Sequence, residues 1–267
     1  MTTFTVTTLD DFVGADGQRS LREAVNAANA SPDADTIVFA PGLEGGTLVL
    51  TGGQLVLSHN VTIDGDSDTN GGEVTISGND ASRIFEITGA GTQVALRDVT
   101  LSHGSPQYDG AYQYSNGGAV LLSAGNLALD GVTIADSQAG GGTHDRGGGI
   151  YAASGTRLDI ANSSLMRNEA LSIDGGGGGA IATGSGVTLT ISHSEFAHNS
   201  AGFNPEFATG GGAIQLGGGV LTIEDSRIHD NAGPYGGGVR AYQGSEVHIA
   251  RTSIVDNAAT HGGGVFS

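Results

Sequence analysis

Five polar residues recur at intervals of 26 to 32 positions in the second half of the chain: Asp136, Arg167, His198, Asp230 and Asp256. If each interval is one coil of a stack, neighbouring members lie about 5 Å apart. Arg167 could then pair with Asp136, and His198 with Asp230. Stacked Asp230 and Asp256 would suit retaining glycoside hydrolysis, or like-charge repulsion would raise the pKa of one of them. The alternative, which we favour, is a solvated ladder of mixed polar residues on a corner.

A second group of candidates lies in the variable insertions that separate the recurring units. Exposed aromatic rings beside carboxylates are typical of surfaces that stack on sugar rings. We therefore predict glycan contacts through Tyr108, Asp109, Tyr112, Tyr114, Phe203, Glu206 and Tyr235. The alternative, that these rings pack within their own loops, stays open.

A third candidate site is a run of oxygen ligands at alternate positions, followed by Gly71. It consists of Asp64, Asp66, Asp68 and Asn70. This pattern resembles the first half of a calcium loop, so Ca²⁺ is the one cofactor we expect. The position of the bidentate Glu is occupied by Ser77, which excludes an EF-hand. A plain Asx-rich turn between strands is the competing interpretation.

Composition narrows the class of protein. The 267 residues carry a formal charge of −18, and their ten basic residues are all scattered arginines, so we expect no nucleic-acid partner. No apolar run approaches the ~20 residues that span a bilayer, so we expect no membrane insertion by this segment. The first residues lack the basic and apolar regions of a secretory signal peptide, so we expect none in this segment. The absence of lysine weakens a lyase mechanism with a lysine base.

Two repeated signatures define the elements that must position these residues. Six units share an apolar residue, four mostly polar residues and a second apolar residue, and they begin at Leu96, Leu129, Ile160, Ile191, Ile223 and Ile249. Two glycines followed by a small and a β-branched residue recur at Gly117, Gly147, Gly178, Gly211, Gly236 and Gly262. Short runs that alternate apolar residues with Thr or Ser indicate strands with one buried face. Such strands become stable by stacking on copies of themselves.

The sequence therefore predicts an all-β fold, a right-handed single-stranded parallel β-helix with a short N-terminal capping helix. Asn168, Asn199, Asn231 and Asn257 fall in register, three residues after the second apolar position of their units. We expect a buried ladder in which each amide bonds the next coil. We also expect these asparagines to take the left-handed backbone conformation that Asn tolerates.

The N-terminal segment differs from the repeats. Ser20 and Glu23 form a capping box that begins an amphipathic helix over 21–30. We assign residues 1–35 to a cap and residues 36–267 to the β-helix, with first strands at 36–39, 47–50, 55–57 and 61–63. The glycine signature at Gly262 opens a unit that is not completed, so we expect the β-helix to be truncated at its C-terminal end.

Two motifs resemble known bacterial families. Arg19–Val25 with Asp35–Phe39 resembles the CSLREA motif of large exported β-helix proteins, with Arg19 in place of the Cys. The Gly-Gly-Ala-Ile signatures, followed downstream by Phe196-Ala-His-Asn199, resemble repeats of the polymorphic outer-membrane proteins, which are surface adhesins. These resemblances imply an extracellular or cell-surface location, reached by an export signal outside this segment.

Two functions follow as expectations. The first is an adhesin, structural or glycan-binding module of a larger secreted or surface protein, whose partner is a polysaccharide or a matrix or cell-surface component. The second is a polysaccharide-active enzyme, a glycoside hydrolase or lyase, that uses the column from Asp136 to Asp256 or the loop edge. We lean away from the enzyme. Ice binding is disfavoured because T-x-T triplets do not recur in register.

Overall fold

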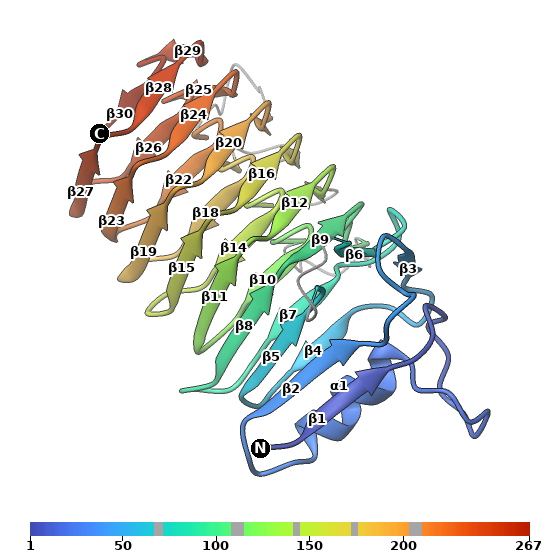
Figure 1. The fold of residues 1–267 in the computed structure, drawn as a ribbon. Coiled ribbons are helices and arrows are strands. Elements are labelled where there is room, and N and C mark those ends of the chain that lie inside the picture. Colours follow the sequence, from blue (N-terminus) through green and yellow to red (C-terminus); the bar gives the residue numbers. More distant parts are fainter. Residues whose placement is uncertain (67–71, 108–114, 141–144, 172–175, 203–209) are drawn as a thin grey trace.

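The chain winds into one stack of parallel coils. The computed structural model describes residues 1–66, 72–107, 115–140, 145–171, 176–202 and 210–267. Successive coils lie on one another, with the two termini toward opposite ends of the stack (Figure 1). The strands form four parallel sheets, here named A to D.

Sheets A and B follow each other within a coil. Sheet A has nine strands in the order β1 (Thr3–Val6), β2 (Asp35–Phe39), β5 (Val61–Asp64), β8 (Gln93–Arg97), β11 (Asn126–Asp130), β15 (Arg157–Ala161), β19 (Val187–Ser192), β23 (Gly219–Glu224) and β27 (Ser245–Ala250). Sheet B has eight, in the order β3 (Thr47–Val49), β6 (Val74–Ser77), β9 (Val99–Ser102), β12 (Thr133–Ala135), β16 (Ser164–Met166), β20 (Glu195–Ala197), β24 (Arg227–His229) and β28 (Ser253–Val255).

Sheets D and C complete the coil. Sheet D has five strands, β13 (Gln138–Gly140), β17 (Glu169–Leu171), β21 (Ser200–Ala201), β25 (Ala232–Tyr235) and β29 (Ala258–His261). Sheet C has eight, β4 (Leu55–Leu57), β7 (Phe85–Ile87), β10 (Val120–Leu122), β14 (Ile150–Ala152), β18 (Ile181–Thr183), β22 (Ile214–Leu216), β26 (Val239–Ala241) and β30 (Val265–Phe266).

Strand pairing confirms the predicted repeat frame. Leu96, Leu129 and Ile160 are register partners in sheet A, and the same column continues through the later units. The second apolar residues pair in the same way in sheet B. Both columns are buried through most of the stack, and each fully buried Leu or Ile contributes roughly 1.5–3 kcal/mol relative to an exposed one. Alternation along each strand thus fills the core and leaves every second side chain facing outward.

The glycine signatures mark the turn into sheet C. Gly147 has a φ of 69°, a left-handed conformation that glycine adopts without steric cost. At Gly148, a Cβ would collide with backbone atoms of Glu169 in the next coil. The first glycine therefore supplies the turn, and the second permits close approach between coils.

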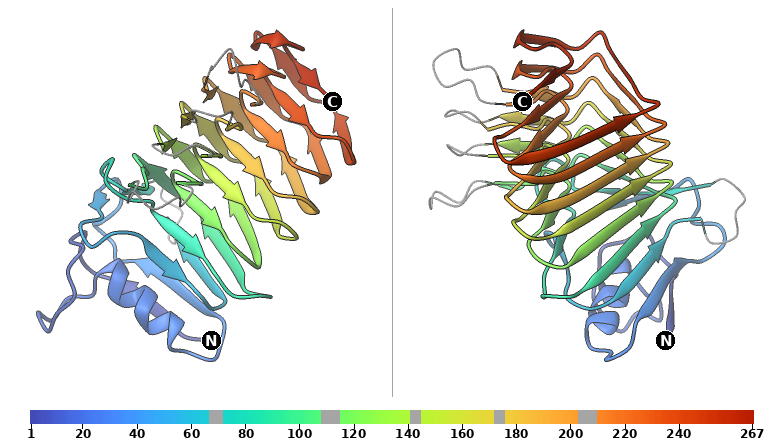
Figure 2. Two further views of the ribbon diagram at one scale, coloured as in Figure 1. Left: turned by 180° about the vertical axis from the view of Figure 1, so that it is seen from behind. Right: turned by 90° about the vertical axis from the view of Figure 1, so that its left-hand side faces the viewer.

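The predicted helix and its capping box are confirmed. Helix α1 (Leu21–Asn29) begins after Ser20, whose hydroxyl accepts from the Glu23 N–H, while Glu23 accepts from the Ser20 N–H. Its apolar face is buried and packs against β1, β2 and β4 at the N-terminal end of the stack (Figure 2). At this end of the stack the structure also contains a strand that the sequence analysis missed. Strand β1 lies within residues 1–35, yet it pairs with β2 as the edge of sheet A.

Candidate functional site

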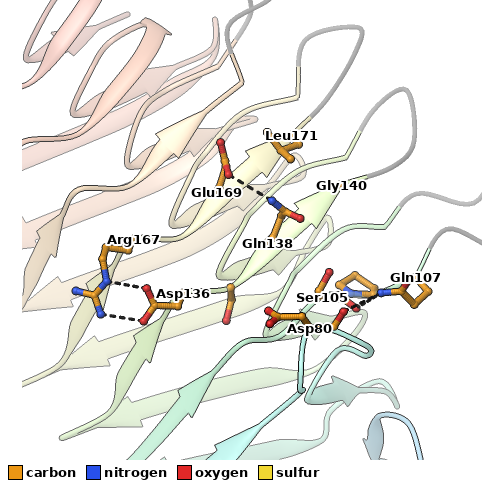
Figure 3. A pocket seen from close by; sticks show the side chains of 11 residues that line it. Asp80, Ser105, Gln107, Asp136, Gln138, Gly140, Arg167, Glu169 and Leu171 are labelled. Atoms are coloured by element: carbon orange, nitrogen blue, oxygen red, sulfur yellow. Dashed lines mark hydrogen bonds and ion pairs between the residues drawn. The ribbon is translucent and has the colours of Figure 1, made fainter.

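A polar groove lies where sheet B turns into sheet D. Its volume is about 550 Å³, and it crosses several coils of the stack. Figure 3 shows the side chains that line it. The lining residues are Asp80, Ser105, Pro106, Gln107, Asp136, Ser137, Gln138, Gly140, Arg167, Glu169 and Leu171. Carboxylates, amides and a guanidinium dominate, so the groove offers both hydrogen-bond donors and acceptors.

A tight turn between sheets B and D positions an exposed column of five residues, of which Asp136 and Arg167 line the groove. Asp136, Arg167, His198, Asp230 and Asp256 have φ between 52° and 56°. Our expectation that the asparagines hold the left-handed conformation was wrong, because it belongs to the residue before each of them. Asp and His tolerate this conformation better than other residues, whereas Arg167 holds it at a cost of about 1–2 kcal/mol.

The asparagine ladder itself is confirmed. Asn199 Oδ1 accepts from the Asn168 N–H at 3.0 Å and from Asn168 Nδ2 at 3.1 Å. Asn199 Nδ2 donates to the Leu165 carbonyl at 2.8 Å and to Asn231 Oδ1 at 2.9 Å. Asn168, Asn199 and Asn231 are 0% exposed, so their amides are part of the scaffold. The ladder fixes the turn from inside while the preceding side chain points outward.

The pairing of Arg167 with Asp136 is also confirmed. Nε and Nη2 of Arg167 donate to the two carboxylate oxygens of Asp136 at 2.7 and 2.9 Å. These hydrogen bonds lower the pKa of Asp136. Both side chains are partly exposed, so the pair contributes less than about 1 kcal/mol to stability. Its larger effect is to present a fixed charged wall to the groove.

Further along the same wall, Gln138 on β13 donates from Nε2 to Glu169 Oε2 on β17 at 3.3 Å. Gln107 Nε2 donates to the carbonyls of Asp80 and Ser105 at 3.1 and 3.3 Å. Figure 3 shows these groups following one another across neighbouring coils. The groove thus carries ordered polar groups at the spacing of the coils, about 4.8 Å.

The upper part of the column differs from the prediction. Asp230 Oδ2 lies 2.6 Å from His229 Nδ1, rather than in a hydrogen bond with His198. His229 Nε2 lies 2.8 Å from Glu195 Oε1, so this nearly buried imidazole bridges two carboxylates. The hydrogen bond to Asp230, and then that to Glu195, raise the pKa of His229.

The same contact decides the charge of Asp230. Its hydrogen bond with His229 lowers the pKa of Asp230, with a further contribution from the charge of His198. If repulsion between Asp230 and Asp256 raises the pKa of one of them, that carboxylate is not Asp230. Sequence reasoning missed His229 because it considered only the residue directly before each Asn. His229 lies one position earlier, at the end of β24.

Tyr235 is the one predicted aromatic ligand among the described residues. Its ring stacks on His261 one coil away, with centroids 4.7 Å apart and an interplanar angle of 11°. The other predicted glycan contacts, Tyr108, Asp109, Tyr112, Tyr114, Phe203 and Glu206, lie outside the described residues. Whether they bind a glycan stays a prediction.

Half of the predicted calcium loop is described. The Asp66 N–H donates to Asp64 Oδ1 at 3.2 Å, which is the hydrogen bond of an Asx turn. Burial, and then the charges of Asp64, Asp130 and Asp66, raise the pKa of Asp98 on the next coil. Asp68 and Asn70 lie outside the described residues, and within the described ranges no group of three acidic or histidine side chains could hold a metal.

The fold and this geometry define a β-solenoid with polar corners, and a family match agrees. The sequence model of a protein family described as right handed beta helix region matches residues 46–267. The chain belongs to this family. The predicted fold class, an all-β right-handed single-stranded parallel β-helix, is thereby confirmed. A comparison with curated proteins finds no match. Among the described residues, no helix is long and apolar enough to cross a membrane.

Proposed function

We propose that this chain is a β-helix module of a secreted or cell-surface protein, and that it binds a polysaccharide along the groove between sheets B and D. The observation that carries the proposal is the array of fixed polar groups that repeats from coil to coil in this groove. A polymer presents its hydroxyls at regular intervals, so a repeating protein surface can contact several sugars at once.

The chemistry of the groove fits sugar hydroxyls. A hydroxyl both donates and accepts, and the groove pairs acceptors at Asp80, Asp136 and Glu169 with donors at Arg167 and Gln138. The hydrogen bonds between these side chains hold them in place before a ligand arrives, which lowers the entropy lost on binding. Pro106 and Leu171 add apolar surface for the ring faces of sugars.

Binding without turnover fits the charge of Asp136. A general acid needs a raised pKa near the working pH, whereas the hydrogen bonds from Arg167 lower the pKa of Asp136. This carboxylate is an ionised acceptor and a poor proton donor. Asp136 is therefore better suited to accepting hydrogen bonds from a glycan than to acting as the general acid that cleaves it.

Titration of the protein with a panel of soluble polysaccharides tests the proposal. We expect at least one to bind, with a weaker complex for Glu169→Gln and an unchanged one for Glu246→Gln, which alters an exposed carboxylate on sheet A. Equal affinity of the two variants for the polysaccharide would show that it binds outside the groove. Failure of every polysaccharide to bind would overturn the proposed function.

One observation favours a second candidate, a polysaccharide-active enzyme. Glu195, His229 and Asp230 form a carboxylate–imidazole–carboxylate chain at the surface of sheet B, and such a chain can hold and transfer a proton. Incubation with the same panel, followed by assays for reducing ends and unsaturated products, would detect turnover. Turnover that Asp230→Ala abolishes would replace the binding proposal with this one.

A further inference from the structure

The stack has an open end at its C-terminal coil, residues 245–267, where β27, β28, β29 and β30 lie (Figure 1). The inward-facing apolar residues of this coil are partly exposed, whereas their register partners in the preceding coil are fully buried. Ile249 is 37% exposed against 0% for Ile223, and Val265 is 42% exposed against 0% for Val239. The apolar core of the solenoid therefore reaches the surface at this end.

The same coil also ends all four sheets. Strands β27, β28, β29 and β30 each have one neighbour in their sheet, so one edge of each has no strand beside it among the described residues. Such an edge presents N–H and C=O groups that can pair with another strand. Apolar side chains and strand edges are thus exposed together at this end of the stack.

The N-terminal end of the stack is closed instead. Helix α1 packs there against β1, β2 and β4, and its apolar residues, among them Leu21 and Val25, are buried. A second copy could not seat its C-terminal coil on this end without displacing the helix. Head-to-tail assembly, which would build an open filament, is therefore disfavoured.

The shape of the open end selects its partner. A single added strand would cover the edge of one sheet and leave the other three open. The C-terminal coil of a second copy has the same cross-section, the same four edges and the same apolar residues, and a twofold axis can bring the two coils face to face. A standard protein interface takes about 20–30 residues from each partner, and residues 245–267 form a coil of that size.

Charge does not oppose this contact. The whole chain has a formal charge of −18, but the coil contains only one arginine, Arg251, and two carboxylates, Glu246 and Asp256. Arg251 Nε also lies 2.6 Å from Asp225 Oδ1 in the preceding coil. Two such coils can therefore meet without a concentration of like charge between them.

We propose that residues 245–267 form a dimer interface, through which two copies of this chain join end to end in a twofold-symmetric contact. The strand edges of one copy pair with those of the other, and Ile249 and Val265 become buried. The inference goes beyond the proposed function and does not depend on it. Because the dimer carries two copies of the groove between sheets B and D, one long polymer could contact both.

Sedimentation velocity of the full chain, from low to high micromolar concentration, tests the proposal. We expect the mass to rise from 26.6 kDa to twice that value. Ile249→Asp places a carboxylate in the contact on both copies and should weaken dimerisation about tenfold or more. The matched control is Val56→Asp, which makes the same kind of change at a 39% exposed side chain on β4 and should leave dimerisation unchanged.

Hydrogen exchange locates the contact without any substitution, and it decides the question if Ile249→Asp does not fold. The amides of residues 245–267 should exchange more slowly at concentrations where the dimer forms, whereas those of β1 should not change. A chain that stays monomeric at every concentration would overturn the inference. A dimer protected outside the C-terminal coil, equal weakening by the two variants, or assemblies larger than a dimer would also overturn it. Each of these results would leave the proposed polysaccharide binding intact.

Discussion

The two corners that flank sheet B make the same kind of turn with different side chains. Where sheet A turns into sheet B, Ser194 Oγ accepts from the Ser163 N–H in the previous coil and donates to the Ser192 carbonyl. Where sheet B turns into sheet D, Asn199 makes four hydrogen bonds that reach the coils on both sides. The Ser194 hydroxyl closes its own turn and bonds to one neighbouring coil, whereas the Asn199 amide bonds to the coils on both sides.

Both corners place a left-handed residue before the ladder. This residue is His193 at the serine corner and His198 at the asparagine corner, with φ of 48° and 56°. The inward residue repeats from coil to coil, whereas the outward residue varies in type and charge. The inward residue of each corner therefore holds the scaffold, whereas the outward residue can vary without breaking the ladder.

The largest expected effect separates the two ladders. Asn199→Ala removes four hydrogen bonds and leaves buried donors and acceptors without partners, so we expect the free energy of unfolding to fall by about 3 kcal/mol or more. Ser194→Ala removes two hydrogen bonds and should cost about 1 kcal/mol. Urea denaturation of both variants measures the difference. Equal losses would contradict the distinction between the corners.

Calcium should have a smaller effect, because the predicted loop lies outside both ladders. If Asp64, Asp66, Asp68 and Asn70 bind Ca²⁺, adding the ion should raise the melting temperature by about 2 °C by mass action. The double variant Asp66→Ala/Asp68→Ala should not respond. If the melting temperature of the wild type is the same in calcium and in EDTA, the calcium site is wrong and the segment is a plain Asx-rich turn.

The pH dependence tests the imidazole beside the asparagine corner. The raised pKa of His229 means that its charged form is stabilised by folding. This stability is fully present below the unfolded pKa of about 6.5 and is lost as the pH rises through the folded pKa. The lowered pKa of Asp230 acts in the opposite direction, since that contribution disappears as the pH falls through its folded value.

His229→Gln should therefore remove the loss of stability that begins as the pH rises above the unfolded pKa of about 6.5. Denaturation midpoints measured from slightly acidic to alkaline pH check this, with His248→Gln on the face of sheet A as the control. The charged or titratable groups around His229 are Asp230, Glu195, Arg227 and His198. An unchanged pH profile in His229→Gln would show that these surrounding groups, rather than the imidazole, set the dependence.

Much of the fold could be predicted because its determinants are periodic. The apolar frame, the glycine signatures and the asparagine ladder all follow from spacing in the sequence, and strand pairing confirms them. Strand β1 escaped prediction because neither β1 nor its partner β2 carries the apolar frame or the glycine signature of the later coils. The serine ladder, formed by Ser163, Ser194 and Ser226, was missed because serine is common in polar turns. A single serine there does not indicate a ladder.

The site could be predicted only where partners share a column. Arg167 and Asp136 occupy equivalent positions in successive coils, so spacing alone brings them together. The contact between His229 and Glu195 joins two outward positions of sheet B that are not register partners. Arg240 contacts Tyr235 and Tyr242, which do not occupy equivalent positions in successive coils. The spacing of the repeats therefore does not predict these contacts.

The central claim is that the outward side of the asparagine corner binds a polysaccharide. Arg167 and Arg251 make similar pairs with an aspartate of the previous coil, one in the groove and one at the serine corner. The most direct measurement is the affinity of Arg167→Gln and Arg251→Gln for a polysaccharide that the wild type binds. The account predicts weaker binding for Arg167→Gln alone, with similar small losses of stability in both variants. Full affinity in Arg167→Gln, or a loss in Arg251→Gln alone, would contradict it.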